Sequence, residues 1–364
     1  MGETPLTPAD GHSFEDETAG LLLESAFDLL AKGGWGNFSL RAVADSIGAA
    51  GSAASHRFGD RAGLVTAVCD TAVMRERVQM QQFLPGVEVD TGDELAAILC
   101  EWLEQRVRWN RKQARACSEL LLVSYRDPYF GAFGGQWTGA CREMIARLYP
   151  AASEDGVRAM AAFLSVEIAS WLLLADDPQF RLASGEALRR VALLGGGKGG
   201  ALPVFWLGRG LKTVDAAKPM DLTGTKQKIV EATAHIILES GVQALTHREI
   251  AKRSGASLSS LTYHFESLND LIRSGLRLIF SPGQPAPAAP GRALVGYELT
   301  LQALRDPFLA PLAATVRRRL GQGLFDDARP GDIQAMARRE ARAMLETAFL
   351  LSGDEIGSSR WLKD

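Results

Sequence analysis

The chain lacks the marks of several large classes of protein. Its four cysteines, Cys69, Cys100, Cys117 and Cys141, lie far apart in 364 residues and form no C-x-x-C pair. This disfavours a disulfide framework and a cysteine-ligated metal site, and it fits buried free thiols in a reducing cytosol. Residues 1–14 have no basic stretch followed by an apolar run, so we expect a disordered tail and no secretory signal. No apolar stretch is long enough to predict a membrane span.

An excess of charge of one sign is also missing. The 40 Lys and Arg residues against 43 Asp and Glu residues give a formal net charge of -3 and a pI near 6.0. The chain as a whole is therefore not attracted to a polyanion, and any contact with nucleic acid has to come from locally placed cationic side chains.

Catalytic motifs are missing as well. The sequence contains no Ser-His-acid, H-E-x-x-H or phosphate-loop pattern, and the glycine run at 195–200 has neither a preceding strand nor a Gly-Lys-Ser/Thr ending. We interpret that run as a linker and predict no enzymatic activity, no cofactor and no metal. The five histidines fall in the tail or in the repeated segments described next: His12, His56, His235, His247 and His264.

What the chain has is an internal repeat. Residues 24–64 align without a gap with residues 231–271, at an offset of 207. The spacing of the glycines and apolar residues in both copies is typical of a helix-turn-helix. The matched positions include Glu24 with Glu231, Gly34 with Gly241, Arg41 with Arg248, Gly48 with Gly255 and Phe58 with Phe265.

The repeat extends past this segment. Residues 119–122 and 126–129 match 298–301 and 305–308 at an offset of 179, and residues 157–161 match 333–337 at an offset of 176. Because the offset falls by 28 residues, the second copy has lost about one helix and a loop. The sequence therefore predicts a whole module that was duplicated and then trimmed, in a chain long enough for two cores.

The fold class predicted from the pattern is all-α. Nothing alternates with period two over a useful length, whereas apolar residues recur at helical spacing throughout. Ser39 and Asp60 are placed to open helices in the first copy, and a Pro-rich loop is expected at 281–291. In the second copy a capping box is expected at 246–249 and another at 267–270. Further helices are expected at about 19–32, 93–109, 111–125, 128–148, 155–176 and 184–195.

One motif of the second copy carries a family resemblance. Thr246-x-Arg248-Glu249-Ile250-Ala251 followed by Gly255-Ala256-Ser257-x-x-x-Leu261-x-Tyr263-His264-Phe265 closely resembles the DNA-binding signature of TetR-family regulators. The resemblance covers essentially the whole chain, twice. It implies a three-helix reading head and, after it, a helical core that binds a small ligand and dimerises. The implied domains are 15–64 (first head), 65–215 (first core), 222–271 (second head) and 272–364 (second, shortened core).

The resemblance also implies how the two modules are arranged. We expect them to pack as a pseudo-dimer within one chain, with the helices of 155–195 and 330–352 forming the dimer-like bundle. The resemblance further implies a DNA-binding transcriptional regulator. We expect a repressor that a small apolar or aromatic effector releases from a double-stranded operator. The alternative is a small-molecule sensor that acts through protein contacts, with one or both heads no longer binding DNA.

The second head holds the stronger candidates for DNA contact. Arg248 is positioned either for a phosphate or for a carboxylate of the chain itself, and Thr246 and Ser257 can act as helix caps as well as contacts. The candidates that we expect to meet phosphates and base edges are Lys226, Thr246, Arg248, Ser257, Ser259, Ser260, Thr262, Tyr263 and His264.

The first head departs from the pattern. Ala50 cannot cap the third helix and Gly51 weakens it, so we expect little direct base readout there. A degraded head kept as a structural partner explains the same residues. The candidates for backbone contact are Ser39, Arg41, Ser52, Ser55, His56 and Arg57.

Aromatic residues are concentrated on the core helices of the first module, where the resemblance places the ligand pocket. Ordinary core packing explains the same pattern, because aromatic side chains dominate helical cores without binding anything. The shortened second module is expected to hold no pocket or a smaller one. The candidates for effector contact are Trp102, Trp109, Tyr125, Trp137, Phe163 and Trp171, with Glu119 as a polar anchor.

Overall fold

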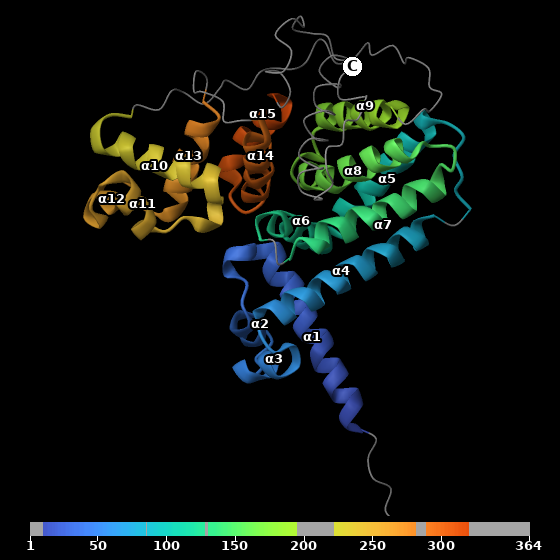
Figure 1. The fold of residues 1–364 in the computed structure, drawn as a ribbon, viewed down its shortest axis with the longest axis horizontal. Helices are drawn as coiled ribbons and strands as arrows, with labels where there is room; N and C mark the ends of the chain where they lie inside the picture. The colour runs from blue at the N-terminus through green and yellow to red at the C-terminus, as the bar shows by residue number, and fades with distance from the viewer. Residues whose placement is uncertain (1–9, 85, 128–129, 195–221, 282–288, 320–364) are drawn as a thin grey trace, which may run out of the picture.

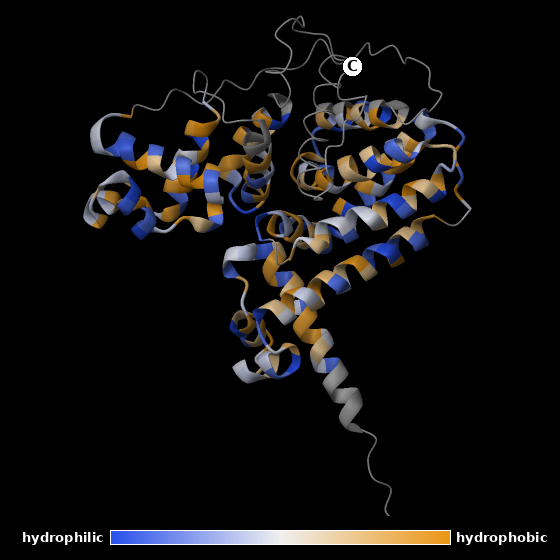
Figure 2. Cartoon of the chain, viewed as in Figure 1, coloured by the Kyte–Doolittle hydropathy of each residue, from blue (hydrophilic) through white to orange (hydrophobic). Residues whose placement is uncertain are grey.

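The computed structural model describes residues 10–84, 86–127, 130–194, 222–281 and 289–319. Within these residues every regular element is a helix, which confirms the all-α prediction. Figure 1 shows the chain as two groups of helices that meet near the middle of the molecule. Figure 2 shows hydrophobic and hydrophilic residues mixed along most helices, as amphipathic packing requires.

The first module runs from a three-helix head into a bundle. Its head is α1 (Asp10–Gly33), the short 3-10 helix η1 (Trp35–Asn37), α2 (Leu40–Ser46) and α3 (Gly51–Phe58). The hydroxyl of Ser39 accepts the N–H of Ala42 at 3.1 Å and thereby opens α2, as predicted. The bundle consists of α4 (Arg61–Phe83), α5 (Gly92–Arg108), α6 (Arg111–Arg126), α7 (Ala132–Leu148), α8 (Glu154–Leu174) and α9 (Pro178–Leu194).

The second module repeats this order in shorter form. Its head is α10 (Gly224–Ser240), η3 (Val242–Ala244), α11 (His247–Ser254) and α12 (Leu258–His264). The core follows with α13 (Leu268–Ile279), α14 (Ala289–Ala303), η4 (Pro307–Leu309) and α15 (Ala310–Arg319). By the offset of 179, α14 is the counterpart of α6, and α13 has 12 residues where α4 has 23. No counterpart of α5 is found among the described residues, which agrees with the predicted trimming.

Helix α14 joins the two modules. Leu294, Tyr297 and Leu301 are buried in the apolar core of the first module, whereas Val295 and Leu299 on the other side of the helix are buried in the core of the second. The helix packs on α6 and α8 of the first module and on α10 of the second. A single helix therefore contributes to both cores, and separating the modules would expose apolar surface on each.

Several boundaries differ from those predicted. Helix α1 already begins at Asp10, so the expected tail of 1–14 overlaps the helix, and residues 1–9 lie outside the described residues. Helix α14 begins at Ala289 with Pro290 in its first turn, where proline is tolerated, so the loop expected at 281–291 ends earlier. The linker at 195–200 and the expected bundle helix at 330–352 lie outside the described residues.

Helix α8 departs from the expectation about membrane spans. By length and composition α8 (Glu154–Leu174) is apolar enough to cross a membrane, with a mean hydropathy of 1.6 over its most apolar 18 residues. In the structure, 83% of that window is buried among the other helices. Burial on all sides explains why the helix is apolar all round.

Candidate nucleic-acid interface and effector core

The third helix of the second head presents a broad free face. Leu261 and the following Phe265 are buried and fix α12 against its own head, which leaves the opposite side of the helix in solvent. Leu258 is 55% exposed and Tyr263 is 84% exposed, and the Tyr263 ring meets the half-buried His264 edge-on at a centroid distance of 5.0 Å. Large exposed side chains on a short, well-anchored helix are suited to contact with a groove.

Thr246 and Ser257 cap α11 and α12 as predicted, but the reciprocal half of the capping box expected at 246–249 is not formed. The Thr246 hydroxyl accepts the N–H of Glu249 at 3.1 Å, and the Ser257 hydroxyl accepts the N–H of Ser260 at 3.1 Å. The carboxylate of Glu249 bonds to Arg253 at 3.3 Å, a contact that the capping-box prediction did not include. Thr246 and Ser257 therefore act as caps in the free protein, while both remain exposed.

Arg248 and Lys226 of the second head are cationic side chains that are exposed. Arg248 is exposed, and no ion pair joins it to any carboxylate of the described residues, which bears against the intrachain alternative. Arg253, one turn away, is instead held by Glu239 at 2.6 Å. Lys226 is exposed at the start of α10. The remaining candidates, Ser259 and Thr262, are exposed on α12, and Ser260 is half-buried.

The first head is poorer in such groups. No side chain caps α3 at Ala50, as predicted, and Ala54 is its only described residue that is fully buried. Arg41 forms an exposed ion pair with Asp45 at 3.5 Å. Ser39 is half-buried and is used as the α2 cap, while the candidates Ser52, Ser55, His56 and Arg57 are exposed.

The predicted effector residues divide into two groups. Trp102, Trp137, Trp171 and Phe163 are each at most 2% exposed and share one apolar core. Trp137 stacks on Phe133 with a centroid distance of 5.9 Å, and the indole N–H of Trp171 donates to the Ser184 hydroxyl at 2.8 Å. The other two lie at the surface: Trp109 is 80% exposed and Tyr125 is 38% exposed. The structure does not bring these two together with the buried group.

Glu119 lies elsewhere than expected. It is 2% exposed, and its carboxylate pairs with Arg305 of the second module and accepts the backbone N–H of Trp35 at 3.4 Å. Both oxygens are therefore engaged at the junction of the two modules. The contact arises because α14 of the second module lies against α6.

A buried polar cluster in the first core was missed from the sequence. Glu76 on α4 and Arg106 on α5 are 0% and 1% exposed, with Oε2 and Nη2 at 2.6 Å. Arg106 also bonds to Gln79, which donates to Gln113 on α6 at 3.1 Å. Arg106 interrupts the apolar face of its helix, one turn after Trp102, and that interruption is the signal that could have revealed it.

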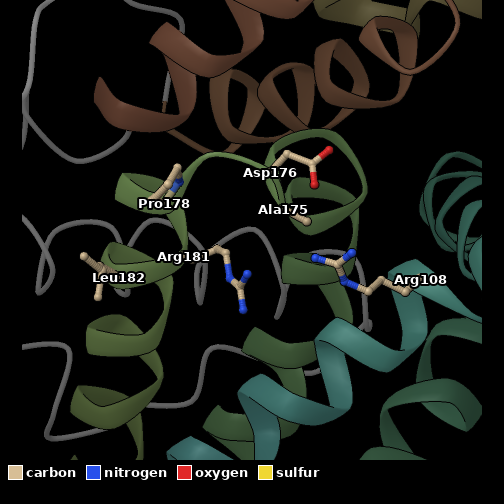
Figure 3. A pocket seen from close by; sticks show the side chains of 6 residues that line it. All are labelled: Arg108, Ala175, Asp176, Pro178, Arg181 and Leu182. Carbon is tan, nitrogen blue, oxygen red and sulfur yellow. The ribbon is translucent and has the colours of Figure 1, made fainter.

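A shallow hollow of about 500 Å³ opens where α5 and α9 approach the end of α8. Figure 3 shows Arg108, Asp176 and Arg181 around it, with Ala175, Pro178 and Leu182 completing the lining. None of the predicted effector residues lines this hollow. The buried tryptophans are therefore not part of it.

Comparison with known proteins bears directly on the heads. The family model described as "Bacterial regulatory proteins, tetR family" matches residues 22–68 and 229–274, which span α1–α4 and α10–α13. The chain carries two TetR-type helix-turn-helix domains in tandem, at the positions that the repeat predicted. Both matches include the helix-turn-helix and the beginning of the helix that follows it.

One curated relative is similar over a short stretch of the chain. The HTH-type transcriptional regulator PksA of Bacillus subtilis (strain 168) is 34% identical over 62 residues. The matched segment covers 17% of this chain and 30% of that protein, so the chain spans under a third of the relative's length. The similarity to a helix-turn-helix transcriptional regulator agrees with the family-model matches.

Burial of Glu76 in the first core predicts a pH dependence. Burial raises the pKa of its carboxyl from 4.5 to about 7 against the opposing effect of Arg106. The folded chain then holds a proton between these pH values that the unfolded chain releases, so stability falls as the pH rises from about 4.5 to about 7. Relative to Glu76→Gln, we expect the wild-type free energy of unfolding to drop by roughly 1–3 kcal/mol over this range.

Urea denaturation at a series of pH values measures this difference. Glu101→Gln, a change at an exposed position on α5, serves as the matched control and should show no such drop relative to wild type. A wild-type advantage over Glu76→Gln that is constant, or that grows as the pH rises, would contradict the assignment.

Proposed function

We propose that this protein is a DNA-binding transcriptional regulator in which the second head supplies most of the sequence specificity. The observation that carries the proposal is the free face of α12, on which Tyr263 is 84% exposed, together with the exposed Arg248 on α11. Side chains of this kind reach base edges and phosphates, whereas α3 of the first head offers the short side chains of Ser52 and Ser55, with His56 and Arg57 only in its last turn.

The asymmetry predicts unequal effects of mutation on operator affinity. Arg248→Ala or Tyr263→Ala should each weaken binding by about 1–3 kcal/mol, because each removes one contact to DNA. Ser52→Ala, the matched change in the first head, should alter the affinity little. A mobility-shift titration on an operator selected from genomic fragments measures all three, and equal losses from the two heads would reject the asymmetry. We expect the operator to be an imperfect palindrome.

The heads are proposed to act as the two halves of an intrachain pseudo-dimer. Support comes from contacts between equivalent positions: the Tyr297 hydroxyl donates to the carbonyl of Ser118 at 3.1 Å, and these two residues are related by the repeat offset of 179. Contact between equivalent residues is the mark of an isologous interface. Here it runs through α6 and α14, and one chain would supply both heads of an operator complex.

The proposed division of labour follows the helices. Residues 15–64 and 222–271 form the reading heads, and 65–215 and 272–364 form the cores, with the effector site in the first core. Helix α4 leads directly from the first head into that core and carries Glu76 and Gln79 of the buried cluster. A small apolar or aromatic effector among the buried tryptophans would shift α4 and release DNA by changing the populations of head arrangements.

The competing function is a sensor that acts through protein contacts in the cytoplasm. The net charge of -3 agrees with this function, because a chain of that charge has no bulk attraction to DNA. The two are separated by the salt dependence of binding to genomic fragments: operator binding needs a specific site and weakens steeply with salt through counterion release. Binding to no fragment at 50 mM salt would favour the sensor.

A further inference from the structure

Two buried carboxylates at the module junction, one from each module, make equivalent contacts. In the second module, Glu298 on α14 is 0% exposed, and its Oε1 accepts the backbone N–H of Val242 at 2.7 Å. Val242 is the first residue after the glycine turn that ends α10, so this bond holds the turn of the second head. The other oxygen of Glu298 accepts from Arg126 of the first module, with Nη2 and Oε2 at 2.6 Å.

The first module shows the reciprocal arrangement. Glu119 on α6 accepts the backbone N–H of Trp35, the first residue after the turn that ends α1, and pairs with Arg305 of the second module. Glu119 and Glu298 are equivalent by the offset of 179, as are Arg126 and Arg305, and Trp35 and Val242 are equivalent by the offset of 207. Each head therefore rests on a carboxylate of its own core that is paired with an arginine of the other core.

The two turn glycines make room for these arginines. Gly34 and Gly241 have φ values of 67° and 82°, in the left-handed region that favours glycine. A Cβ atom at Gly34 would lie 2.6 Å from Nη1 of Arg305, and one at Gly241 would lie 2.5 Å from Cζ of Arg126. The arginine of the other module thus packs directly on the backbone of each turn.

The turns themselves also meet. A Cβ atom at Gly36 would lie 2.5 Å from Oε1 of Gln243, and these positions are again equivalent by the offset of 207. The two reciprocal ion pairs and the turn contact form one junction, which we call the latch: Trp35, Glu119 and Arg305 on one side, and Val242, Glu298 and Arg126 on the other.

We propose that Arg126 and Arg305 are positioning residues that act crosswise: the arginine of each core holds the turn after the first helix of the other module's reading head in place. Loss of Arg126 leaves Glu298 buried without its cation, and a carboxylate in that position either takes up a proton or moves toward water. In both cases its bond to Val242 weakens, so the second head loosens while the first keeps Glu119 paired with Arg305. Loss of Arg305 has the mirror-image effect.

The latch gives the two heads a fixed relative orientation. Two heads that are each seated by the other module present one spacing to DNA, which suits a bipartite operator with adjacent half-sites. This consequence rests on the proposed function, whereas the latch itself is a property of the free protein and is tested without DNA.

Amide hydrogen exchange on the full chain tests the proposal. In Arg126→Gln we expect exchange at the α10–η3 turn, which includes Val242, to rise at least tenfold, with the α1–η1 turn unchanged. In Arg305→Gln we expect the reverse, with the rise at the turn that includes Trp35. Arg41→Gln, which breaks an exposed ion pair within the first head, is the control and should change neither turn.

The crosswise role would be overturned by equal changes in amide exchange at both turns, by a change only at the turn of the mutated module, or by no change at either turn. If Arg126→Gln does not fold, Arg126→Lys keeps the charge without the planar fork, and it must show the same crossed pattern at smaller size. A crossed pattern in a chain that binds no operator fragment would leave the latch standing and reject the DNA-binding function.

Discussion

Replacing Arg106 alone by methionine is expected to lower the free energy of unfolding by about 3–5 kcal/mol, as measured by urea denaturation at pH 7.5. Arg106 and Glu76 are 1% and 0% exposed in the middle of the first core. The substitution removes the cation that opposes the effect of burial on Glu76, so its carboxyl must take up a proton at pH 7.5 or stay ionised in an apolar environment, and both cost free energy. Gln79 also loses the donor of one of its hydrogen bonds.

Two further variants test whether the loss of stability comes from burial of the ion pair. Glu76→Leu combined with Arg106→Met removes both charges together, so we expect a stability within about 1.5 kcal/mol of wild type. Arg77→Met removes a cation paired with Glu143 at the surface at 3.0 Å and should cost about 1 kcal/mol or less. An Arg106→Met variant no less stable than Arg77→Met would contradict the structure of this cluster.

The second large effect concerns the buried tryptophans. Trp137→Ala is expected to lower the free energy of unfolding by about 3–5 kcal/mol, because a ring that is 1% exposed leaves a cavity against Phe133. Trp109→Ala, at an 80% exposed position, is the matched control and should change stability by no more than about 0.5 kcal/mol. Similar losses of unfolding free energy in the two variants would contradict the buried position of Trp137 and the exposed position of Trp109.

The same variant bears on the proposed effector site. If Trp137 lines that site, an apolar effector quenches tryptophan fluorescence and releases DNA over one concentration range, and Trp137→Ala shifts both curves together. An effector that releases DNA with unchanged concentration dependence in Trp137→Ala would identify this residue as plain core. Both curves are recorded well below the unfolding midpoint of the variant, so that loss of stability does not enter.

The heads were largely predictable from the sequence because their signals are local. Ser39, Thr246 and Ser257 each cap the helix that follows, as their positions indicated. A cap and its partner lie within three residues of each other, so composition and spacing are enough to place it. Gly34 and Gly241, which the repeat pairs, likewise follow the first helices of the two heads, and both have a positive φ that favours glycine.

The junction could not be predicted in the same way. Glu119 was interpreted as a pocket anchor, yet it pairs with Arg305, which lies 186 residues further along the chain. The repeat showed that both residues have equivalents, but an offset gives no information on which copies meet. Trp109 follows the last residue of α5 and points to solvent, a placement that depends on where the helix ends against its neighbours.

The central claim is that one chain supplies both heads of an operator complex. Native mass spectrometry of the protein on its operator, together with a footprint of the same complex, tests it most directly. We expect one chain per operator, with protection over two adjacent major grooves about 34–36 Å apart, stronger in the half-site of the second head. Two chains per operator, or protection of a single groove by one chain, would contradict it.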